Sequence, residues 1–446
     1  MKKLIALLLA LVLVVGLVAC GGKKTDTDKP AGDDTDKPAG DDTAKGSVYY
    51  LNFKPEADAA WQEFAKAYTE KTGVEVKVVT AASGSYDSTL SNEMAKDGAP
   101  TLFQCGNAIA LENWSDYTLD LTDAEFVKAL TSSNFTMNDA DGKVKAVAYC
   151  TETYGIIVNT KLLGDAGYTL DQIKDFASLK TIAEDIHARA AELGFDAFAS
   201  AGLDGSSSWR FSGHLTNMPL FYEFRDNNVT GQPATVTGAY MNNYRNIWDL
   251  YINNSAVNPV ELTTATGDMS QAEFGTGKAV FWQQGTWEYA NLIGEKYNMD
   301  PANLEMIPIY CGVEGEENSG LCTGSENYWC VNAKSSEADI KATLEFLNYV
   351  VTSEEGLQLL VDQFGAVPFK NAPEVSNIFA NDGVELVNAG KYPVTWAFTV
   401  TPNVDSWRAG IVSALAAYSA DQTDANWEKV VDAFVTGWAI EYNAQG

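Results

Sequence analysis

The sequence predicts an α/β protein whose folded body is long enough for two large domains. This body runs from Ser47 to Gly446, about 400 residues, whereas a single domain typically holds roughly 100–200. Hydrophobic residues make up 46% of the chain and aromatic residues 11%, so enough apolar side chains are available for two cores. Strand-like and helix-like patterns alternate from residue 48 to residue 104, which indicates a parallel sheet with helical crossovers.

The alternating region begins with a short β-prone run at residues 48–51. Apolar side chains then recur at helical spacing between Trp61 and Tyr68, and Gly73 follows a lysine as a stop signal for that helix. Residues 74–79 alternate between apolar and charged side chains, as in a strand. A strand, a helix and a strand within about thirty residues predict parallel pairing with a right-handed crossover.

A second helix at residues 86–96 and a third strand at residues 99–104 continue this pattern. Open sheets of this kind bind ligands beyond the carboxyl ends of their strands. The loops at residues 52–56 and 104–108 follow two of these strands. We therefore expect both loops to border a binding site.

The N-terminus has the features of a secretory signal. Lys2 and Lys3 precede an uncharged apolar run from residue 4 to residue 18, which is too short for a typical membrane-spanning helix. The sequence Leu-Val-Ala-Cys at residues 17–20 resembles the lipobox of bacterial lipoproteins. That resemblance implies a signal peptide at residues 1–19, cleavage before Cys20 and lipid chains on Cys20. The alternative is a plain secretory signal with an incidental cysteine.

Residues 20–46 are predicted to form a disordered tether. The octapeptide Thr-Asp-Lys-Pro-Ala-Gly-Asp-Asp occurs at residues 27–34 and again at 35–42, and residues 21–46 contain no aromatic side chain. Such a segment has almost nothing to bury. It would separate the folded body from a membrane to which Cys20 is anchored.

Charge and cysteine content exclude several functions. The formal net charge is −30, which argues against nucleic acid as a partner because nucleic-acid binding needs a basic surface. The chain has two histidines and no CxxC motif, so neither a zinc site nor another metal site is predicted, and no cofactor is expected. Five cysteines remain besides Cys20, and spacing leaves open whether Cys311 and Cys322 form a disulfide.

Short motifs in a consistent order resemble one known family. They are the helix end at residues 64–73, the turn at 98–100, the segments 152–159 and 161–163, the glycine-containing segments 274–278 and 285–287, and residues 364–368. At these positions the chain resembles the extracytoplasmic solute-binding proteins of ABC importers, specifically the sugar-binding branch that includes the maltose-binding protein. Thr101 stands where that family usually has an aspartate.

The resemblance implies a periplasmic-binding-protein-like fold of type II. Two α/β lobes would be joined by three chain crossings, with hinges near Gly155, Gly324 and Gly365, and would close on a ligand in the cleft between them. The N-terminal lobe would comprise residues 47–151 and 328–366, and the C-terminal lobe residues 152–327 and 367–446. A monomer is expected that captures a carbohydrate, most simply an oligosaccharide, and delivers it to the membrane permease of an ABC transporter.

A sugar presents apolar C–H faces and many hydroxyls, so its site needs flat aromatic rings and short polar side chains. Trp209, Trp287 and Trp407 are the candidate stacking platforms. Trp287 and Trp407 lie where the family has such residues, whereas Trp209 lies in a polar loop. The alternative for each tryptophan is a place in the core.

Glu152 is the strongest polar candidate, because it lies in an apolar run where a carboxylate needs a partner. The other polar candidates are Lys54, Glu56, Asn107 and Glu326, with Tyr86 and Asn327 as weaker ones. A solvated surface loop is the alternative for Lys54 and Glu56. Arg210 and Arg408 adjoin two of the tryptophans, and we expect them to pair with surface carboxylates rather than with an acidic sugar.

Two other functions are compatible with the composition. A secreted carbohydrate-active enzyme would need two facing carboxylates, and the many acidic residues do not rule this out. Nucleophile-elbow, His-Glu-x-x-His and P-loop motifs are absent from the sequence, however, and His187 and His214 belong to no catalytic motif. The other possibility is a non-sugar solute such as a polyamine, which acidic and aromatic side chains together would bind.

Overall fold

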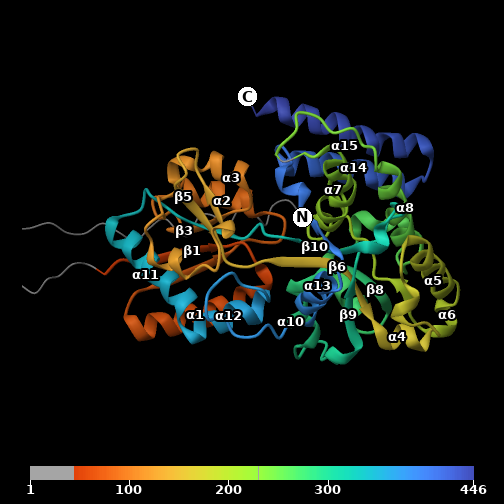
Figure 1. Cartoon of the computed structure of the whole chain (residues 1–446), viewed down its shortest axis with the longest axis horizontal. Coiled ribbons are helices and arrows are strands. Elements are labelled where there is room, and N and C mark those ends of the chain that lie inside the picture. Colours follow the sequence, from red (N-terminus) through yellow and green to blue (C-terminus); the bar gives the residue numbers. More distant parts are fainter. Residues whose placement is uncertain (1–44, 230, 446) are drawn as a thin grey trace, which may run out of the picture. The chain divides into compact units, whose positions relative to one another are not determined.

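The structure is a computed structural model that describes residues 45–229 and 231–445. The predicted signal peptide, Cys20 and all but the last residues of the predicted tether lie outside the described residues. Within the described ranges, no helix combines the length and the apolar character needed to cross a membrane. Two six-stranded sheets organise the described part, and we refer to each sheet with its helices as a lobe (Figure 1).

The sheet of the first lobe has the strand order β2-β1-β3-β11-β5-β4. Its strands are β1 (Val48–Asn52), β2 (Val76–Thr80), β3 (Leu102–Cys105), β4 (Thr136–Asn138), β5 (Val144–Ala148) and β11 (Tyr328–Val331). β1 pairs in parallel with both β2 and β3, which confirms the parallel β-α-β arrangement predicted from the sequence. β11 enters antiparallel to β3 and β5 after a long excursion of the chain.

Helices cover both faces of this sheet. They are α1 (Asp58–Thr72), α2 (Tyr86–Met94), α3 (Ala108–Asn113), α11 (Glu337–Thr352) and α12 (Glu354–Phe364). Alternate side chains of β1 explain the two covered faces: Tyr50 packs in the core with α1, α11 and α12, whereas Leu51 packs in the core with α2 and α3. α1 ends where predicted, because Gly73 adopts the left-handed conformation with φ of 71°.

The sheet of the second lobe has the strand order β12-β10-β6-β8-β7, and β9 pairs with β6. Its strands are β6 (Glu152–Asn159), β7 (Asp196–Phe198), β8 (Ala279–Gly285), β9 (Leu304–Ile307), β10 (Ser319–Gly324) and β12 (Tyr392–Thr395). All eight residues of β6 and all seven of β8 are buried, so these two strands form the centre of the lobe.

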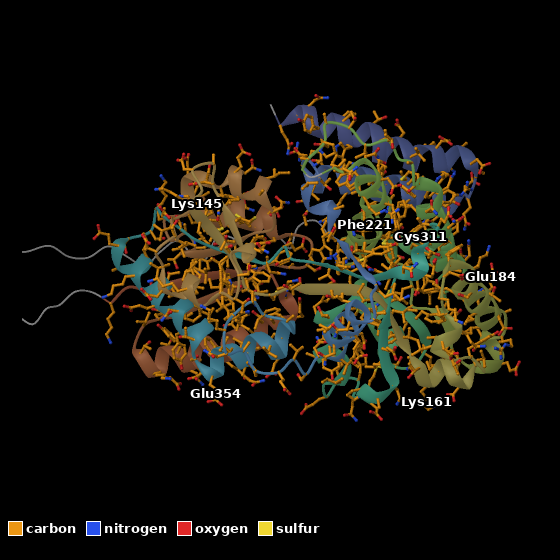
Figure 2. All side chains as sticks on the ribbon, in the orientation of Figure 1. Lys145, Lys161, Glu184, Phe221, Cys311 and Glu354 are labelled. Atoms are coloured by element: carbon orange, nitrogen blue, oxygen red, sulfur yellow. The ribbon has the colours of Figure 1, made fainter. Side chains whose placement is uncertain are left out.

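Two helical layers enclose the second sheet. The larger core contains side chains of α4 (Thr160–Asp165), α5 (Phe176–Ala188), α7 (Asn217–Asn227), α8 (Met241–Asn253), α14 (Val404–Ala420) and α15 (Asp424–Ala444). The smaller core contains side chains of α9 (Gly267–Gly275), α10 (Tyr289–Ile293) and α13 (Ile378–Asn388). α6 (Ala190–Leu193) continues α5. Exposed charged residues such as Lys161 and Glu184 lie on the outside of this lobe (Figure 2).

The chain passes between the lobes three times, between β5 and β6, between β10 and β11, and between α12 and α13. Two of these passages lie side by side, because the Thr151 amide donates to the Ala366 carbonyl at 2.8 Å. Gly365 has φ of 80°, a conformation that favours glycine. Phe369 still packs in the core of the first lobe, a few residues past the boundary predicted at residue 366.

The five cysteines among the described residues are free and buried. Cys311, which Figure 2 labels, and Cys322 both belong to the larger core of the second lobe, but they are not bonded to each other. The possible Cys311–Cys322 disulfide is therefore not present in this structure. Burial raises the pKa of the Cys322 thiol to about 12, so this thiol stays protonated and unreactive.

Candidate functional site

A cavity of about 820 Å³ lies between the two lobes. The first lobe contributes the predicted strand-end loops, represented by Lys54 after β1 and Asn107 after β3, together with the start of α2. The second lobe contributes Trp209, Trp287 and the start of α14, and Glu152 lies where the chain passes from one lobe to the other. The volume is within the range of roughly 300–1,000 Å³ that is usual for small-molecule sites.

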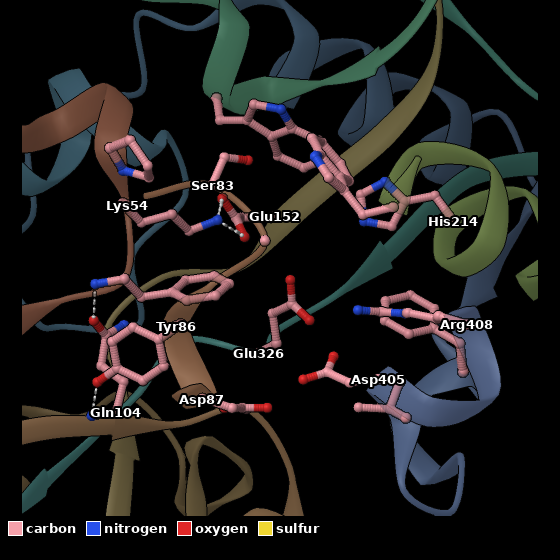
Figure 3. A pocket seen from close by; sticks show the side chains of 18 of the residues that line it. Lys54, Ser83, Tyr86, Asp87, Gln104, Glu152, His214, Glu326, Asp405 and Arg408 are labelled. Carbon is pink, nitrogen blue, oxygen red and sulfur yellow. Dashed lines mark hydrogen bonds and ion pairs between the residues drawn. The ribbon is translucent and has the colours of Figure 1, made fainter. Parts of the chain in front are cut away.

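Lys54 and Glu152 form a buried ion pair in the cavity wall (Figure 3). The Lys54 ammonium donates to both carboxylate oxygens of Glu152, at 2.8 and 2.9 Å, and the residues are 6% and 1% exposed. The Asn327 amide donates to Glu152 Oε2 at 2.5 Å. Glu152 therefore has the partners that a buried carboxylate needs, and the alternative of a solvated surface loop does not apply to Lys54, which is buried.

The electrostatics of this group follow from its burial. Burial acts to lower the pKa of Lys54, but the carboxylates of Glu152, Glu56 and Glu326 outweigh it and raise that pKa, so the ammonium stays charged. Glu56 lies 3.9 Å from Lys54 Nζ. Burial raises the pKa of Glu56 to about 7, although Lys54 acts to lower it. Glu56 thus titrates near neutral pH.

Aromatic rings of the second lobe form another part of the cavity wall. His214, in the short π-helical segment Arg210–Leu215, stacks on Tyr154 with ring centroids 4.1 Å apart and an interplanar angle of 7°. Trp209 meets the His214 ring edge-on at 4.9 Å and lies 6.0 Å from Trp287. The Lys54 ammonium lies 5.4 Å from the Trp287 ring centre. These rings give the cavity flat apolar faces beside its polar groups.

Trp287 is held in place by its own strand. It follows β8 in a short helical turn, and its Nε1–H donates to Gln284 Oε1 at 2.8 Å. The ring folds back over Gly285, where a Cβ atom would stand 2.3 Å from ring carbons of Trp287. Glycine is therefore needed at position 285 because the Trp287 ring leaves no room for a Cβ atom. The backbone conformation of Gly285 is extended and does not itself require glycine.

A second set of polar side chains lies in another part of the cavity wall. Asp87 is in the first turn of α2, Asp405 is in the first turn of α14, and Glu326 lies in the passage between β10 and β11. Figure 3 shows the carboxylates of Asp87 and Asp405 pointing toward one another, with Glu326 and Arg408 beside them. Burial and the facing Asp405 carboxylate raise the pKa of Asp87 to about 6, and burial also raises the pKa of Glu326.

The structure brings seven of the eight predicted site residues to this cavity. They are Lys54, Glu56, Asn107, Glu152, Trp209, Trp287 and Glu326. Asn107 caps α3 by accepting from the Ala110 amide, so it also has a structural role. Tyr86 lines the cavity as well, whereas Asn327 is fully buried behind Glu152. Their roles in binding stay a prediction.

Trp407 is the exception, since it does not line the cavity. It is 1% exposed in the core of the second lobe, where its Nε1–H donates to the Phe434 carbonyl at 3.0 Å and its ring packs edge-on against Trp438. The helix α14 presents Trp407 to α15, and it presents Asp405 and Arg408 to the cavity. Trp407 is therefore a core residue and not a stacking platform.

The two arginines also differ from expectation. Arg210 is buried and donates to the carbonyls of Gln283 and Ser200 and to Ser207 Oγ, rather than pairing with a surface carboxylate. Burial lowers the pKa of Arg210 to about 10. Arg408 lines the cavity, and the ion pairs found within residues 45–229 and 231–445 do not include it.

Sequence reasoning missed several lining residues, among them Asp87, Phe398 and Asp405. Asp87 follows Tyr86 at the start of the helix that was predicted just after a strand. The same strand-end rule could therefore have identified Asp87 as a candidate lining residue. Phe398 lies shortly after the end of β12, and Asp405 is in the first turn of α14, but neither of these elements is among those predicted above. The sequence alone does not decide whether His214 lines a cleft or packs in the core, and in the structure it does both.

Comparison with solved structures shows the same fold in proteins of low identity. The solute-binding protein RafE in complex with raffinose has a TM-score of 0.70 at 15% identity, and the match covers 89% of this chain and 99% of that one. A chitin oligosaccharide binding protein has a TM-score of 0.69 at 15% identity, with 90% and 100% covered. BlMnBP1, an ABC-transporter binding protein from Bifidobacterium animalis subsp. lactis in complex with mannobiose, has a TM-score of 0.62 at 13% identity, with 90% and 95% covered.

These matches confirm the predicted two-lobe fold. A search of curated protein sequences finds no match. Residues 63–383 match the family model for bacterial extracellular solute-binding proteins, which is more than half of the 446 residues. The chain therefore belongs to the bacterial extracellular solute-binding proteins, and it binds a solute outside the cell rather than transforming one.

Proposed function

We propose that the solute is a carbohydrate, most simply an oligosaccharide. The observation that carries this proposal is the joint presence of Trp209, Trp287 and Phe398 with amide, carboxylate and hydroxyl groups around one cavity of about 820 Å³. Indole and phenyl faces suit the C–H faces of sugar rings, and the polar groups suit their hydroxyls. The ligands named for the similar structures, raffinose and mannobiose, support the same class.

Binding is proposed to work by closure without chemistry. Each lobe contributes part of the cavity wall, so a solute that touches both lobes favours the arrangement in which both sets of contacts form. The closed form would then dock on the permease of an ABC transporter and release the solute there. Anchoring through lipid on Cys20, with residues 20–46 as the tether, would keep the protein near that permease.

A polyamine is the second candidate, because the cavity lining contains more carboxylates than cationic side chains. A thermal-shift panel separates the two classes, since a ligand that binds only the folded state raises its melting temperature. Raffinose, mannobiose and chitin oligosaccharides form one arm of the panel, and spermidine and putrescine form the other. Stabilisation by a saccharide and not by the amines supports the carbohydrate proposal, whereas the reverse result contradicts it.

A matched pair of tryptophan variants in the same panel tests whether the aromatic side chains of the cavity bind the saccharide. Trp209→Ala removes a partly exposed ring from the cavity wall and should reduce the saccharide-induced shift. Trp114→Ala removes a partly exposed tryptophan that does not line the cavity, and should leave the shift unchanged. Equal shifts in both variants would contradict the aromatic wall as the binding surface.

Anchoring is tested separately in cells. Cys20→Ala should release the protein into the medium or block its processing, because the residue that would carry lipid is gone. A variant that stays membrane-bound with unchanged lipid labelling would show that Cys20 is not the anchor.

A further inference from the structure

The aromatic side chains of the cavity differ in how far the protein uses their polar atoms. The aromatic wall consists of four lining side chains of the second lobe: Trp209, His214, Trp287 and Phe398. The Trp209 indole N–H donates to the Ser206 carbonyl at 2.9 Å, and the Trp287 indole N–H donates to Gln284 Oε1 at 2.8 Å. Phe398 has no polar atom in its ring. Among these four rings, that of His214 is the one whose polar atoms the protein leaves unused.

Both ring nitrogens of His214 lack a partner among the described residues. Nδ1 is enclosed by other atoms and forms no hydrogen bond. Nε2 forms none either, but it is not enclosed, and His214 lines the cavity although it is only 3% exposed. Nε2 is therefore the ring nitrogen that a solute in the cavity can reach. Figure 3 accordingly draws no hydrogen bond from the His214 ring (Figure 3). Buried polar side chains nearly always have a partner, so these free nitrogens require an explanation.

The His214 ring is held in a fixed orientation. Its face stacks on Tyr154 with ring centroids 4.1 Å apart, and Trp209 meets it edge-on at 4.9 Å. The Tyr154 hydroxyl donates to the His214 carbonyl at 3.0 Å, so one residue fixes both the ring and the backbone. His214 also belongs to the π-helical segment Arg210–Leu215, and such turns occur frequently at functional sites. A fixed polar group in an apolar surface is suited to select one atom of a ligand.

The protonation of His214 follows from its burial. Burial, and then the nearby charges of Arg408 and Lys54, lower the pKa of His214 well below its usual range, so the ring is neutral. A neutral imidazole has one N–H group and one unprotonated nitrogen. A buried N–H without an acceptor is rarer in proteins than an unused acceptor, which places the proton on Nε2 and leaves the enclosed Nδ1 unprotonated. His214 thus presents an N–H donor to the cavity.

We propose that His214 is a solute-binding residue whose Nε2–H donates to one oxygen atom of a saccharide stacked on the aromatic wall. The saccharide in this statement rests on the proposed function. A sugar that lacks an oxygen at this point, or holds it in another orientation, would leave the N–H unpaired in a closed site. Sites built to bond a particular hydroxyl reject analogues without it, so His214 would determine specificity.

The same donor discriminates between the two candidate classes of solute. A protonated amine has only donors and offers no acceptor to an N–H group. A sugar offers an acceptor at each of its oxygen atoms. An unused N–H donor among the aromatic rings therefore favours a saccharide over a polyamine at the aromatic wall.

Three substitutions separate the hydrogen bond from the packing of the ring. His214→Phe keeps an aromatic ring against Tyr154 and removes both nitrogens. His214→Gln can place an amide N–H near the position of Nε2, whereas the shorter side chain of His214→Asn can place one only near the position of Nδ1. His187→Gln is the control, because His187 lies on α5, bonds to Asp196 and does not line the cavity.

Calorimetry with raffinose, mannobiose and the trisaccharide of N-acetylglucosamine measures the effect. For each of these probes that binds the parent protein, His214→Phe and His214→Asn should bind about tenfold more weakly, as for the loss of one hydrogen bond. His214→Gln should regain part of this loss, and His187→Gln should bind like the parent protein. The melting temperature of ligand-free His214→Phe should not fall, because an apolar ring replaces a group without partners.

Nitrogen NMR of the histidine rings gives a direct readout of the contact. The chain has two histidines, so the signals that disappear in His214→Phe are those of His214. In the ligand-free protein these signals should be those of a neutral ring protonated at Nε2. A saturating concentration of a saccharide that binds should shift the Nε2 signal of His214 and leave the signals of His187 unchanged.

The outcomes distinguish this inference from the proposed function. Unchanged saccharide affinity in His214→Phe, or a His214 signal that stays in place at saturation, overturns the inference and leaves the carbohydrate proposal standing. Equal losses in all three His214 variants would show that the shape of the ring matters and its N–H does not, which contradicts the inference as well. If none of the three saccharides binds the parent protein, the carbohydrate proposal fails and the role of His214 fails with it.

Discussion

Lys54 Nζ lies 2.8 Å from Glu152 Oε1, and this buried pair links the loop after the first strand to the first residue of the strand that opens the second lobe. The two residues are 98 positions apart in the chain. Their contact therefore exists only when both lobes are folded and joined. It places a positive charge and a negative charge side by side in the wall of the cavity.

The first prediction concerns this pair. Glu152→Gln should lower the free energy of unfolding by about 3–5 kcal/mol, because it leaves the Lys54 ammonium buried without its closest partner. Chemical denaturation of the ligand-free protein measures the effect. Lys161→Gln is the control, since it breaks an exposed pair with Asp165 that should contribute at most about 1 kcal/mol. Equal losses in both variants would contradict the structural role of Glu152.

The second prediction concerns pH. Burial raises the pKa of Glu56 from 4.5 to about 7, so the folded protein holds this proton more tightly than the unfolded chain does. The corresponding stability is fully present below pH 4.5 and is lost as pH rises through about 7. Glu56→Gln cannot ionise and should therefore gain stability relative to the parent protein over this interval, by up to about 3 kcal/mol.

Measuring the free energy of unfolding of both proteins across this pH interval isolates Glu56, because every other titrating group is common to the two. Glu63→Gln, at an exposed position of α1, serves as a control that should show no pH-dependent difference. A constant difference between Glu56→Gln and the parent at all pH values would contradict the raised pKa.

Much of the first lobe could be predicted because its signals are local. The apolar spacing from Trp61 to Tyr68 and the stop at Gly73 are enough to define α1 and to imply the parallel pairing of β1 and β2. The strand-end loops then follow from the rule for open sheets, and both line the cavity. Apolar spacing and turn residues depend only on positions that are close together in the chain, so they can be recognised in a single sequence.

The parts of the site that could not be predicted depend on distant residues. A lysine in a loop, such as Lys54, suits a binding site and a solvated surface equally well, and its burial depends on Glu152 at the start of the other lobe. A tryptophan suits a binding site and a hydrophobic core equally well, and only the packing of α15, with Phe434 and Trp438, places Trp407 in the core. No local pattern specifies how two helices meet.

The third prediction concerns Gly285. Gly285→Ala should displace the Trp287 ring, because a Cβ atom would stand 2.3 Å from its carbons, and should weaken saccharide binding. Losing the stacking contact of one large aromatic side chain should cost about 1–3 kcal/mol in calorimetry. Gly410→Ala, in an exposed turn of α14 with open space around it, should leave affinity unchanged and stabilise that helix by about 0.5–1 kcal/mol.

The fourth prediction concerns Trp407. Trp407→Ala should lower the free energy of unfolding by about 3–5 kcal/mol, because it leaves a cavity among α14 and α15. The folded fraction should still bind the solute with unchanged affinity, since Trp407 does not line the cleft. Trp209→Ala should show the opposite pattern, with weaker binding and a smaller loss of stability. Reduced affinity in Trp407→Ala at full folding would place this residue back in the site.

The last prediction concerns closure of the lobes. The three passages of the chain, with Gly365 at φ of 80° in one and the Thr151–Ala366 contact joining two, form the connection about which the lobes can move. Saturating solute should reduce the radius of gyration in small-angle scattering, because contacts to both lobes favour the closed arrangement. Trp209→Ala, measured at the same solute concentration, should show a smaller change because less of the protein is occupied. Superimposable scattering curves with and without solute, at a concentration where calorimetry shows full occupancy, would mean that the cavity is preformed and that the passages only connect two fixed lobes.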